Sequence, residues 1–466
     1  MARIDRAIEP GCDQSSVIEM QRSRPVIEFV NHASFVIDFE GSKIINDPWL
    51  FGTAFNDGWS LLCDSVFDLE RFCEIDCIWI SHEHPDHFSP SVLRSVPEAI
   101  RRNITVLFQQ TADGKVLDFC AELGYRTRSL PHMEPVTLDN GVKVVCGRVP
   151  LYDSWILYDC AGFKVLNIND CAVTPRVLKA IRRVVGRPDV LFTQFSYAGW
   201  KGGPDDEPMR RAAAAAKLRA MQAQIRVLAP TWTAPFASFS YFSHHENRHS
   251  NDSINRPGRA ADAIRVAGSE PVVMYPGDTW RAGDPWNSDA ALQRYSGHYD
   301  FASKRYLSSE STDETTLIEA GRAYAARIRS RNSGALLRLI RMMPLLGLLR
   351  SVTIEAHDLG RRYRLSLEHG LEPLGAPGSP DTPASPDVRM HSSSLEYLLR
   401  HDWGYDTLAV NGRFEADLDG FKKMKKTLSI GSLNNAGHRL TVGLLFDRDF
   451  LRMVRAAALR LSRLGA

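Results

Sequence analysis

The sequence predicts an α/β fold in which two β-sheets pack face to face and helices cover the outside. Residues Val26–Phe39 alternate apolar with polar side chains and turn at Glu40–Ser42 into Lys43–Asn46, which is the pattern of antiparallel hairpins. Beyond them, short apolar runs alternate with helical segments, and apolar runs then return. This order, with hairpins first, alternating strands and helices next and further strands last, is typical of a sandwich of two sheets.

Size and composition are those of a globular protein with a substantial core. The chain has 466 residues, of which 44% are hydrophobic and 24% charged. A net charge of +2 implies no basic surface, so we expect no nucleic-acid partner. The eight cysteines show no CxxC pair, which favours a reducing compartment. Residues 1–24 lack the apolar segment of a signal peptide, and we therefore expect a cytoplasmic protein.

The individual elements follow from local patterns. Ile75–Ser81 is a short apolar run typical of a buried strand, and Pro90 opens a helix towards Ala99 with Ser89 as its N-cap. Five consecutive alanines make Glu207–Ile225 a strong helix prediction. A further helix is predicted at Ala112–Gly124, and further strands at Thr105–Gln109, Val142–Val149, Trp155–Cys160, Lys164–Ile168, Asp189–Thr193 and Val227–Trp232.

The late part of the chain predicts an appended domain. Leu374–Asp387 is rich in Pro, Gly and Ser, as linkers are, and Asn411-Gly412 is a hairpin-turn signal beyond it. From Asp447 the chain reads as a basic amphipathic helix. We expect an N-terminal extension (1–25), a catalytic domain (26–300), a helical and strand extension (301–373), a linker (374–387) and a small C-terminal domain (388–466).

One apolar stretch, Ala335–Leu349, is interrupted by Arg338, Arg341 and Pro344, which disfavours a membrane-spanning helix. Its pattern favours an amphipathic helix packed on the core or on a partner. The alternative is a helix lying on a membrane surface, which would give the protein a peripheral membrane contact.

The chemistry is carried by four residues in a tight loop after the Ile75–Ser81 strand: His82, His84, Asp86 and His87. Imidazole and carboxylate are ligands that suit borderline divalent metals. The His-x-His spacing points His82 and His84 the same way, towards one ion, while Asp86 and His87 face a second ion beside it. Four candidate ligands within six residues predict a two-metal site.

This loop resembles the HxHxDH signature of the metallo-β-lactamase superfamily. The resemblance implies an αββα sandwich with metals at the sheet edges, a bridging aspartate and one distal histidine for the second metal. Asp170, at a strand end, fits the bridging position. His244 or His245 fits the distal position, and we favour His244 as the metal ligand and His245 as a substrate contact.

A second resemblance is to the CMP-N-acetylneuraminate hydroxylase family, which oxidises a nucleotide-sugar N-acetyl group with a Rieske cluster and a metal centre. The residues that carry it are Asp47-Pro48-Trp49-Leu50, Gly52, Ala54-Phe55, Gly58-Trp59, Leu166-Asn167, Asp170-Cys171, Ala234–Ala237, Ser243-His244 and Pro276-Gly277. The Cys-x-His and Cys-x-x-His pairs of a Rieske cluster are missing, and the sandwich begins near Val26, where the resemblance also starts. We therefore expect no iron–sulfur cluster in this chain and, for an oxygenase, an external electron donor.

The superfamily's remaining first-metal histidine also has no counterpart. The corresponding stretch, Gly147–Asp153, contains no histidine, and Asp153, Tyr152 or water is the candidate oxygen ligand. An oxygen-rich site favours iron or manganese over tetrahedral zinc. The alternative is a first site that is weak or empty.

Other residues near the loop have two interpretations each. Asp47 could orient a ligating histidine or cap the turn before Pro48. His32 could contact substrate or make a structural hydrogen bond. Tyr197 and Trp200 lie in a Gly- and aromatic-rich loop of the kind that lines pockets, and we favour a substrate role slightly over packing.

Three functions are compatible with these residues. The first is a non-haem di-iron monooxygenase acting on a small polar or nucleotide-sugar-like metabolite. The second is a hydrolase that uses a metal-bridging hydroxide, and the third is a non-catalytic binding protein. In either enzyme two divalent metals, with iron favoured and zinc or manganese as alternatives, are held by His82, His84, Asp86, His87, Asp170 and His244. Asp86 and Asp170 are the candidate catalytic residues, and Asp86 is also the candidate proton acceptor.

Overall fold

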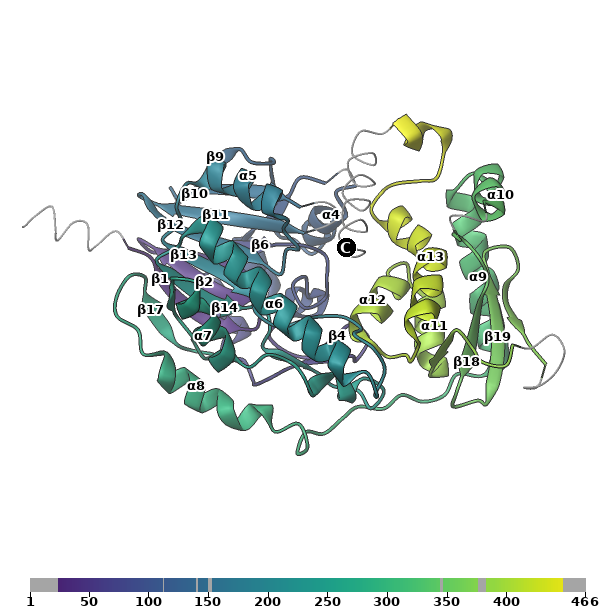
Figure 1. Cartoon of the computed structure of the whole chain (residues 1–466). Helices are drawn as coiled ribbons and strands as arrows, with labels where there is room; N and C mark the ends of the chain where they lie inside the picture. The colour runs from purple at the N-terminus through teal and green to yellow at the C-terminus, as the bar shows by residue number, and fades with distance from the viewer. Residues whose placement is uncertain are drawn as a thin grey trace, which may run out of the picture.

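The fold was analysed in a computed structural model of the chain. It describes residues 24–111, 113–139, 141–149, 153–343, 347–375 and 383–446. The predicted helix from Asp447 and the extension up to residue 23 lie outside these ranges. Figure 1 shows a large two-sheet body on the left and a smaller helical body on the right, joined by a long segment after α8 (Ser288–Ser296).

Two seven-stranded sheets form the large body. The first has the order β17-β1-β2-β3-β6-β7-β8, with strands Thr279–Arg281, Val26–Asn31, Ser34–Phe39, Ser42–Asn46, Cys77–Ile80, Thr105–Gln109 and Arg126–Leu130. The second has the order β16-β14-β13-β12-β11-β10-β9, with strands Glu270–Pro271, Trp232–Phe236, Val190–Gln194, Phe163–Asn169, Ser154–Cys160, Lys143–Arg148 and Pro135–Thr137. Antiparallel hairpins join β1 to β3, whereas β3, β6, β7 and β8 run parallel.

The two sheets face each other across one apolar core. Phe35 of β2 stacks on Phe192 of β13 with ring centroids 4.2 Å apart. Strand β6 is buried on both faces, because Cys77 and Trp79 enter the core between the sheets while Ile78 and Ile80 enter the core on the other side. This double burial explains why its sequence is a continuous apolar run.

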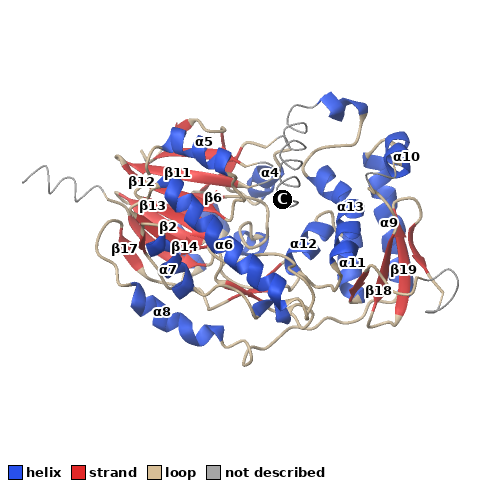
Figure 2. Ribbon diagram, viewed as in Figure 1, coloured by secondary structure: helices blue, strands red, loops and turns tan. Residues whose placement is uncertain are grey.

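Helices cover both outer faces (Figures 1 and 2). Helices α2 (Pro90–Ser95) and α4 (Lys115–Glu122) pack on the first sheet, and α5 (Pro175–Val185), α6 (Glu207–Leu228) and α7 (Pro257–Val266) pack on the second. The αββα arrangement expected from the resemblance is therefore confirmed.

Three local predictions are wrong. The helix from Pro90 ends at Ser95, because Pro97 excludes helical backbone at Val96 and a separate turn, α3 (Glu98–Arg101), follows. The strand expected at Val227–Trp232 begins only at Trp232, because α6 continues to Leu228 and closes at the left-handed Ala229. Asn411-Gly412 is not a hairpin turn: Asn411 ends α12 (Gly404–Asn411), and Gly412 caps it with a φ of 66°.

The smaller body, which we call the C-terminal body, spans residues 314–446. Its helices are α9 (Glu314–Arg331), α10 (Gly334–Met342), α11 (Ser392–Arg400), α12 and α13 (Leu418–Asn435). Its sheet has the order β20-β19-β18-β21, with strands Gly370–Pro373, Arg361–Ser366, Val352–Ala356 and Val388–Met390. No helix among the described residues is long and apolar enough to cross a membrane.

The predicted linker 374–387 connects strands of one sheet. Strand β21 follows it and pairs in parallel with β18, and residues on both sides of it share a single core. Whether residues 388–466 form a unit of their own stays a prediction, but those that the structure describes pack together with residues 314–373. Trp200 of the large body also enters this core, so the two bodies are in direct contact.

A small three-stranded sheet lies beside the ends of the large sheets. It has the order β15-β5-β4, with strands Ser240–Phe242, Trp59–Leu61 and Thr53–Ala54. The turn between β4 and β5 holds Phe55, Asn56 and Asp57 at φ values of 54°, 52° and 58°, which non-glycine residues rarely adopt. Such a turn needs contacts from outside to hold it.

Candidate metal centre

The loop Ser81–His87 starts where β6 ends, at the carboxyl edge of the parallel strands. The backbone N–H of His87 donates to the carbonyl oxygen of His84 at 2.9 Å, which closes the loop into a tight turn. Three ends of other strands meet it there with left-handed, non-glycine backbone: His32 after β1, Asp47 after β3 and Asn169 at the end of β12. Unusual backbone at converging strand ends is common at functional sites.

The first cluster consists of His82, His84 and Asp170. Each offers one ligand atom, and these atoms lie within 4.8 Å of one another. Nε2 of His82 is 2.8 Å from Nδ1 of His84 and 3.8 Å from Oδ2 of Asp170. The structure therefore brings together the two histidines of the His-x-His pair and the aspartate that follows β12.

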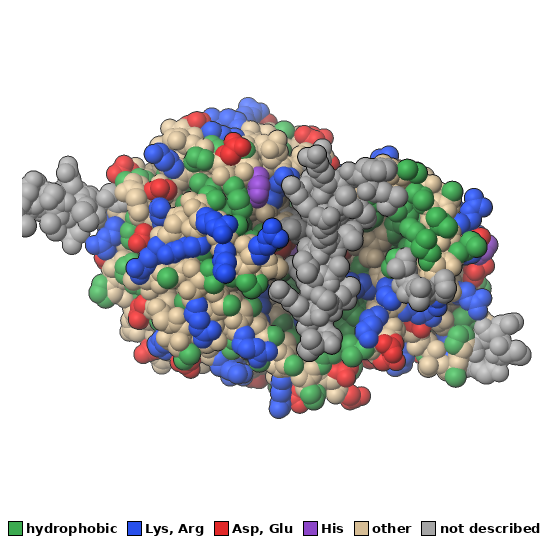
Figure 3. Space-filling view, turned by 45° about the horizontal axis from the view of Figure 1, so that its top comes forward, with side chains coloured by type: hydrophobic (Ala, Val, Ile, Leu, Met, Phe, Trp, Pro, Cys, Tyr) green, Lys and Arg blue, Asp and Glu red, His purple; other side chains and the backbone are tan. Residues whose placement is uncertain are grey.

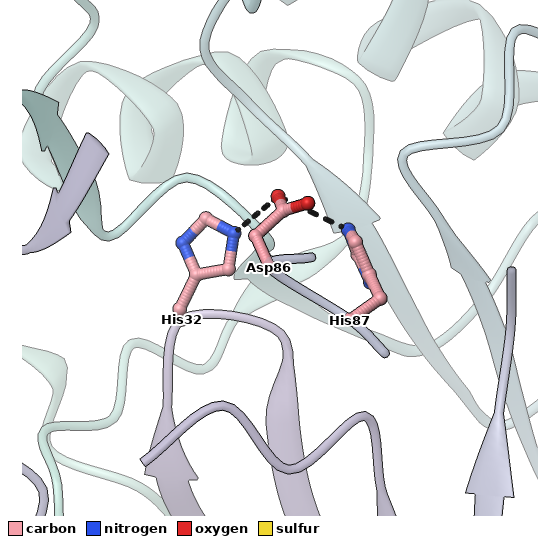
Figure 4. A group of neighbouring side chains, drawn as sticks. All are labelled: His32, Asp86 and His87. Atoms are coloured by element: carbon pink, nitrogen blue, oxygen red, sulfur yellow. Dashed lines mark hydrogen bonds and ion pairs between the residues drawn. The ribbon is translucent and has the colours of Figure 1, made fainter. Parts of the chain in front are cut away.

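The second cluster consists of His32, Asp86 and His87 (Figure 4). Oδ2 of Asp86 lies between the two imidazoles, 3.3 Å from Nε2 of His32 and 3.4 Å from Nε2 of His87. His32 comes from the β1–β2 turn, and its side chain points at Asp86 in Figure 4. Sequence reasoning left His32 between a substrate contact and a structural hydrogen bond. The structure places it as a candidate ligand.

Asp170 lies between the clusters. The same oxygen, Oδ2, is 3.8 Å from Nε2 of His82 in the first cluster and 3.8 Å from Nε2 of His87 in the second. One carboxylate oxygen therefore faces both clusters.

The chemistry of the two clusters fits a pair of divalent cations. Oδ1 of Asp86 and Oδ1 of Asp170 are buried and have no hydrogen-bond partner among the described residues, and Nε2 of His87 has only its longer contacts with these two carboxylates. Buried polar atoms without partners are costly, and in native proteins they commonly indicate a bound ion or water. Carboxylate oxygens together with imidazole nitrogens form the donor set of iron, manganese and zinc sites.

Asp47 supports the second cluster from behind. It is fully buried, and its Oδ2 accepts hydrogen bonds from Nδ1 of His87 (2.9 Å) and from the Ser81 hydroxyl (2.7 Å). Asn169 donates to the same oxygen at 2.7 Å. A carboxylate that fixes Nδ1–H of a histidine turns Nε2 towards the metal. These contacts support the interpretation that Asp47 orients a ligating histidine over the alternative that it caps the turn before Pro48.

Burial and charge shift the pKa values of the histidines in opposite directions in the two clusters. Burial lowers the pKa of His82, and burial together with His82 lowers the pKa of His84 to about 4, so the first cluster has neutral imidazoles. Burial opposes charge on Asp86 and on His87 as well. Their mutual attraction outweighs it, so the pKa of Asp86 is well below and that of His87 well above its usual range. A metal at the second cluster must displace the His87 proton.

Asp153 and Lys217 lie near the first cluster. Burial and the charge of Asp170 raise the pKa of Asp153 to about 6, and its charge also interacts with His84. Asp153 is not a member of either cluster, so its role as a metal ligand stays a prediction. Lys217 of α6 was not singled out from the sequence. Burial lowers its pKa, and its charge interacts with Asp170 and Asp153. The other oxygen-ligand candidate, Tyr152, lies outside the described residues.

His244 makes its contacts elsewhere. Its Nε2 is 3.2 Å from the hydroxyl of Ser309, and its Nδ1 accepts the backbone N–H of Glu246 at 3.2 Å. It belongs to neither cluster among the described residues, and the histidine outside the Ser81–His87 loop that the second cluster contains is His32. His245 is exposed, with its ring centroid 5.9 Å from that of Tyr306. The assignments of both residues stay predictions.

Tyr197 and Trp200 are packing residues in this structure. The Tyr197 hydroxyl donates to the carbonyl oxygen of Ser250 at 2.5 Å. Trp200 is 4% exposed and stacks on Phe421 of the C-terminal body with ring centroids 4.4 Å apart. Tyr197 also lines a small cavity, and the substrate role of both residues stays a prediction.

Comparison with known families gives a match to the β-lactamase superfamily domain over residues 26–193. This range contains both clusters and all but the last three strands of the two large sheets. The superfamily resemblance of the His82–His87 loop is thereby confirmed.

Relatives by sequence include CMP-N-acetylneuraminate hydroxylases. The chain is 31% identical over 152 residues to the inactive human cytidine monophosphate-N-acetylneuraminic acid hydroxylase, covering 31% of this chain and 30% of the relative. It is 26% identical over 269 residues to the mouse hydroxylase, covering 54% of this chain and 46% of the relative. The match thus spans less than half the length of these two relatives, and the similarity to this family is confirmed for the matched part.

Solved structures with a similar fold include CmlA, a diiron β-hydroxylase from Streptomyces venezuelae. It is 16% identical, with a TM-score of 0.41 and coverage of 55% of this chain and 54% of that chain. Igni18, a metallo hydrolase from Ignicoccus hospitalis, is 16% identical, with a TM-score of 0.40 and coverage of 55% and 97%. Scores this low say nothing about the site.

Proposed function

We propose that this protein is a binuclear metalloenzyme, and specifically a non-haem di-iron monooxygenase acting on a small polar or nucleotide-sugar-like metabolite. One observation carries the proposal: each cluster offers two imidazoles and one carboxylate. Two histidines and one carboxylate with open positions are the donor set of non-haem iron oxygenases. The hydroxylase relatives support the same reaction class.

Each clustered residue has a role in this proposal. His82, His84 and Asp170 would hold one iron, and His32, Asp86 and His87 the other. Two ferrous ions would supply the activation of dioxygen. Asp170 would contact both ions through the oxygen that faces both clusters, and Asp153 is the candidate for an additional oxygen ligand at the first. Asp86, whose second oxygen has no hydrogen-bond partner, is positioned to take up a proton.

Electrons would come from a separate donor protein in this scheme. A monooxygenase needs two electrons for each turnover, and we propose an external redox protein as their source. The described cysteines do not pair with histidines at Rieske spacing.

A metal-dependent hydrolase is the second candidate. The shared position of Asp170 favours it, because two cations held on one carboxylate can also activate a water for attack on an ester, amide or phosphodiester. Lys217 would then be placed to offset negative charge near Asp170.

Metal analysis of protein purified without added metal tests the proposal. We expect an iron-to-protein ratio near two, and we expect the reduced protein to change its visible absorption when mixed with oxygenated buffer. Zinc in place of iron, with no response to oxygen, would support the hydrolase. Protein purified without any bound metal would support the third function, a non-catalytic binding protein.

Two variants sharpen this test. Asp170→Ala should lower the bound iron at both clusters, and His32→Ala should lower it at the second only. His369→Ala is the matched control, because His369 lies in a turn of the C-terminal body before β20. Loss of iron in all three variants would point to general instability and would contradict the assignment.

A further inference from the structure

A pocket lies between the segment that follows β15 in the large body and the C-terminal body. It has a volume of about 510 Å³, a size typical of sites for small metabolites. None of the six clustered residues lines it, so it is separate from the metal centre. The pocket therefore raises the question of a second ligand.

Histidines dominate its lining. His244, His245 and His249 come from the segment after β15, and His357 and His391 come from the C-terminal body. The rings of His357 and His391 lie edge to face with centroids 5.8 Å apart. Although imidazoles are metal ligands, these residues do not form a group with ligand atoms close enough to share an ion among the described residues. Their arrangement is that of hydrogen-bond donors spread around a cavity.

The tautomers of two of these rings are fixed by their neighbours. Nδ1 of His244 accepts the N–H of Glu246, and Nδ1 of His391 accepts the N–H of Ser393, both at 3.2 Å. A neutral ring with this bond has its proton on Nε2, which lies 3.2 Å from the Ser309 hydroxyl in His244 and 3.6 Å from Oδ2 of Asp358 in His391.

The buried carboxylate of the pocket is already neutralised. Glu246 accepts hydrogen bonds from Nε of Arg413 (2.8 Å) and from the backbone N–H of His391 (3.0 Å). Arg413 is 1% exposed, so this pair forms a buried link between the two bodies. Glu246 therefore adds little repulsion for an anion entering the pocket.

The remaining lining charges favour an anion. Arg248 is exposed and makes no ion pair with a described residue, and Arg389 is half-exposed. Arg389 pairs with two carboxylates, Glu415 and Glu355, each at 3.0 Å, so Arg248 is the lining guanidinium without an ion pair among the described residues. Arg248, the imidazoles and the hydroxyls of Ser308 and Ser309 thus line one cavity, in which Glu415 is the acidic group without a buried partner.

We propose that this pocket binds a small phosphate-bearing metabolite. A tetrahedral phosphate accepts hydrogen bonds from several directions at once, which suits donors contributed by both bodies. The site would be formed only when the two bodies are in contact, because Arg248 comes from one and Arg389 from the other. This inference does not depend on which reaction the metal centre performs.

Calorimetric titration of the full, metal-loaded chain with inorganic phosphate, pyrophosphate and citrate tests the proposal. We expect pyrophosphate to bind more tightly than phosphate, and citrate to bind weakly or not at all. Arg248→Gln should weaken pyrophosphate binding about three- to tenfold, since it removes one charged donor. Glu415→Gln should tighten it by a similar factor, because it removes a repulsive charge from the pocket, while Arg389 keeps its ion pair with Glu355.

Arg226→Gln, an exposed arginine on α6, is the control and should leave the affinity unchanged. Opposite shifts in the two pocket variants support the proposal, and neither substitution touches the core. Binding that ignores both substitutions and vanishes after chelation would place the anion at the metals and overturn the proposal. So would citrate binding equal to that of pyrophosphate, or a third equivalent of Zn²⁺ that is lost in His357→Gln.

Discussion

The side-chain amide of Asn411 donates a 3.0 Å hydrogen bond to the carbonyl oxygen of Phe55, across 356 positions of the chain. Arg413 adds a bond of 2.7 Å to the carbonyl oxygen of Asn56. These contacts hold the left-handed β4–β5 turn from the C-terminal body. The Phe55 ring in turn packs edge to face on His84, with centroids 5.5 Å apart. The C-terminal body therefore supports a candidate metal ligand through one aromatic ring.

Asn411→Ala should weaken metal binding at the first cluster. The substitution removes one of the two hydrogen bonds to the Phe55 carbonyl, leaving that from the N–H of Gly58 at 3.1 Å, and lets the turn relax, which costs about 0.5–1.5 kcal/mol. We expect a loss of about tenfold in metal affinity and a shifted absorption spectrum of the Co²⁺-substituted protein.

Asn435→Ala is the matched control for that experiment. Asn435 also donates from a buried amide to a backbone carbonyl, that of Asp402 at 2.6 Å, but both residues lie within the C-terminal body. It should lower the melting temperature and leave the Co²⁺ spectrum unchanged. Identical spectra for Asn411→Ala and the unaltered protein would show that the turn does not position His84.

Asp47→Asn should lower metal affinity at the second cluster. The carboxylate accepts Nδ1–H of His87, and loss of such a partner typically costs 10- to 100-fold in metal affinity. Competition with a chromophoric chelator measures this loss. Asp159→Asn, at an exposed turn where the carboxylate accepts the N–H of Gly162, should leave the affinity unchanged.

The stability of the C-terminal body should fall as pH rises from about 4 to about 6. Burial raises the pKa of Asp406 from 3.8 to about 6, so the folded state holds this proton more tightly than the unfolded state. The stabilisation is full at low pH and is lost as the pH passes the folded-state value. Two pKa units correspond to about 3 kcal/mol at most.

Asp406→Asn should therefore flatten this pH dependence and raise the unfolding midpoint in urea at pH 8. The amide oxygen can still accept the Ser432 hydroxyl, which lies 2.7 Å from Oδ1 of Asp406. Parallel pH profiles for the variant and the unaltered protein would contradict the assignment.

Contact with a membrane surface through α10 is a further prediction. Leu339, Met342 and Met343 are 51%, 77% and 41% exposed, and Arg338 and Arg341 lie beside them. Figure 3 shows apolar side chains gathered on the C-terminal body, on the right of the view. We expect binding to vesicles with anionic lipid, reduced severalfold by Leu339→Glu. Val266→Glu, at an exposed apolar position on α7, should have no effect.

Local sequence patterns were sufficient to predict most strands and helices of the sandwich. Strand β7 matches its predicted bounds because its apolar run is flanked by polar turns, and β6 was found because both of its faces are buried. The failures lie where a local signal is shared by two structures. Asn-Gly favours a left-handed residue both in hairpins and at helix ends, and the alanine-rich helix continues through Val227 because its buried face does.

The same contrast between local and shared signals holds for the candidate site. The His82–His87 loop is contiguous in sequence, so its spacing alone reveals it. His32 lies 50 positions before His82 and approaches Asp86 only through strand pairing, so nothing in its own surroundings distinguishes a ligand from a core histidine. His244 matched the expected motif and lies beside Glu246, which pairs with Arg413 of the C-terminal body, and its assignment as a metal ligand stays a prediction.

Because the clustered residues come from both sheets, metal binding should also affect the stability of the fold. His32 and the loop after β6 extend from the first sheet, whereas Asp170 extends from the second. Cations bound by all of these residues would link one sheet of the sandwich to the other. A ligand present at a thousand times its dissociation constant adds about 4 kcal/mol to the free energy of unfolding. Depleting metal from the growth medium should then shorten the lifetime of the protein in cells, apart from any loss of turnover.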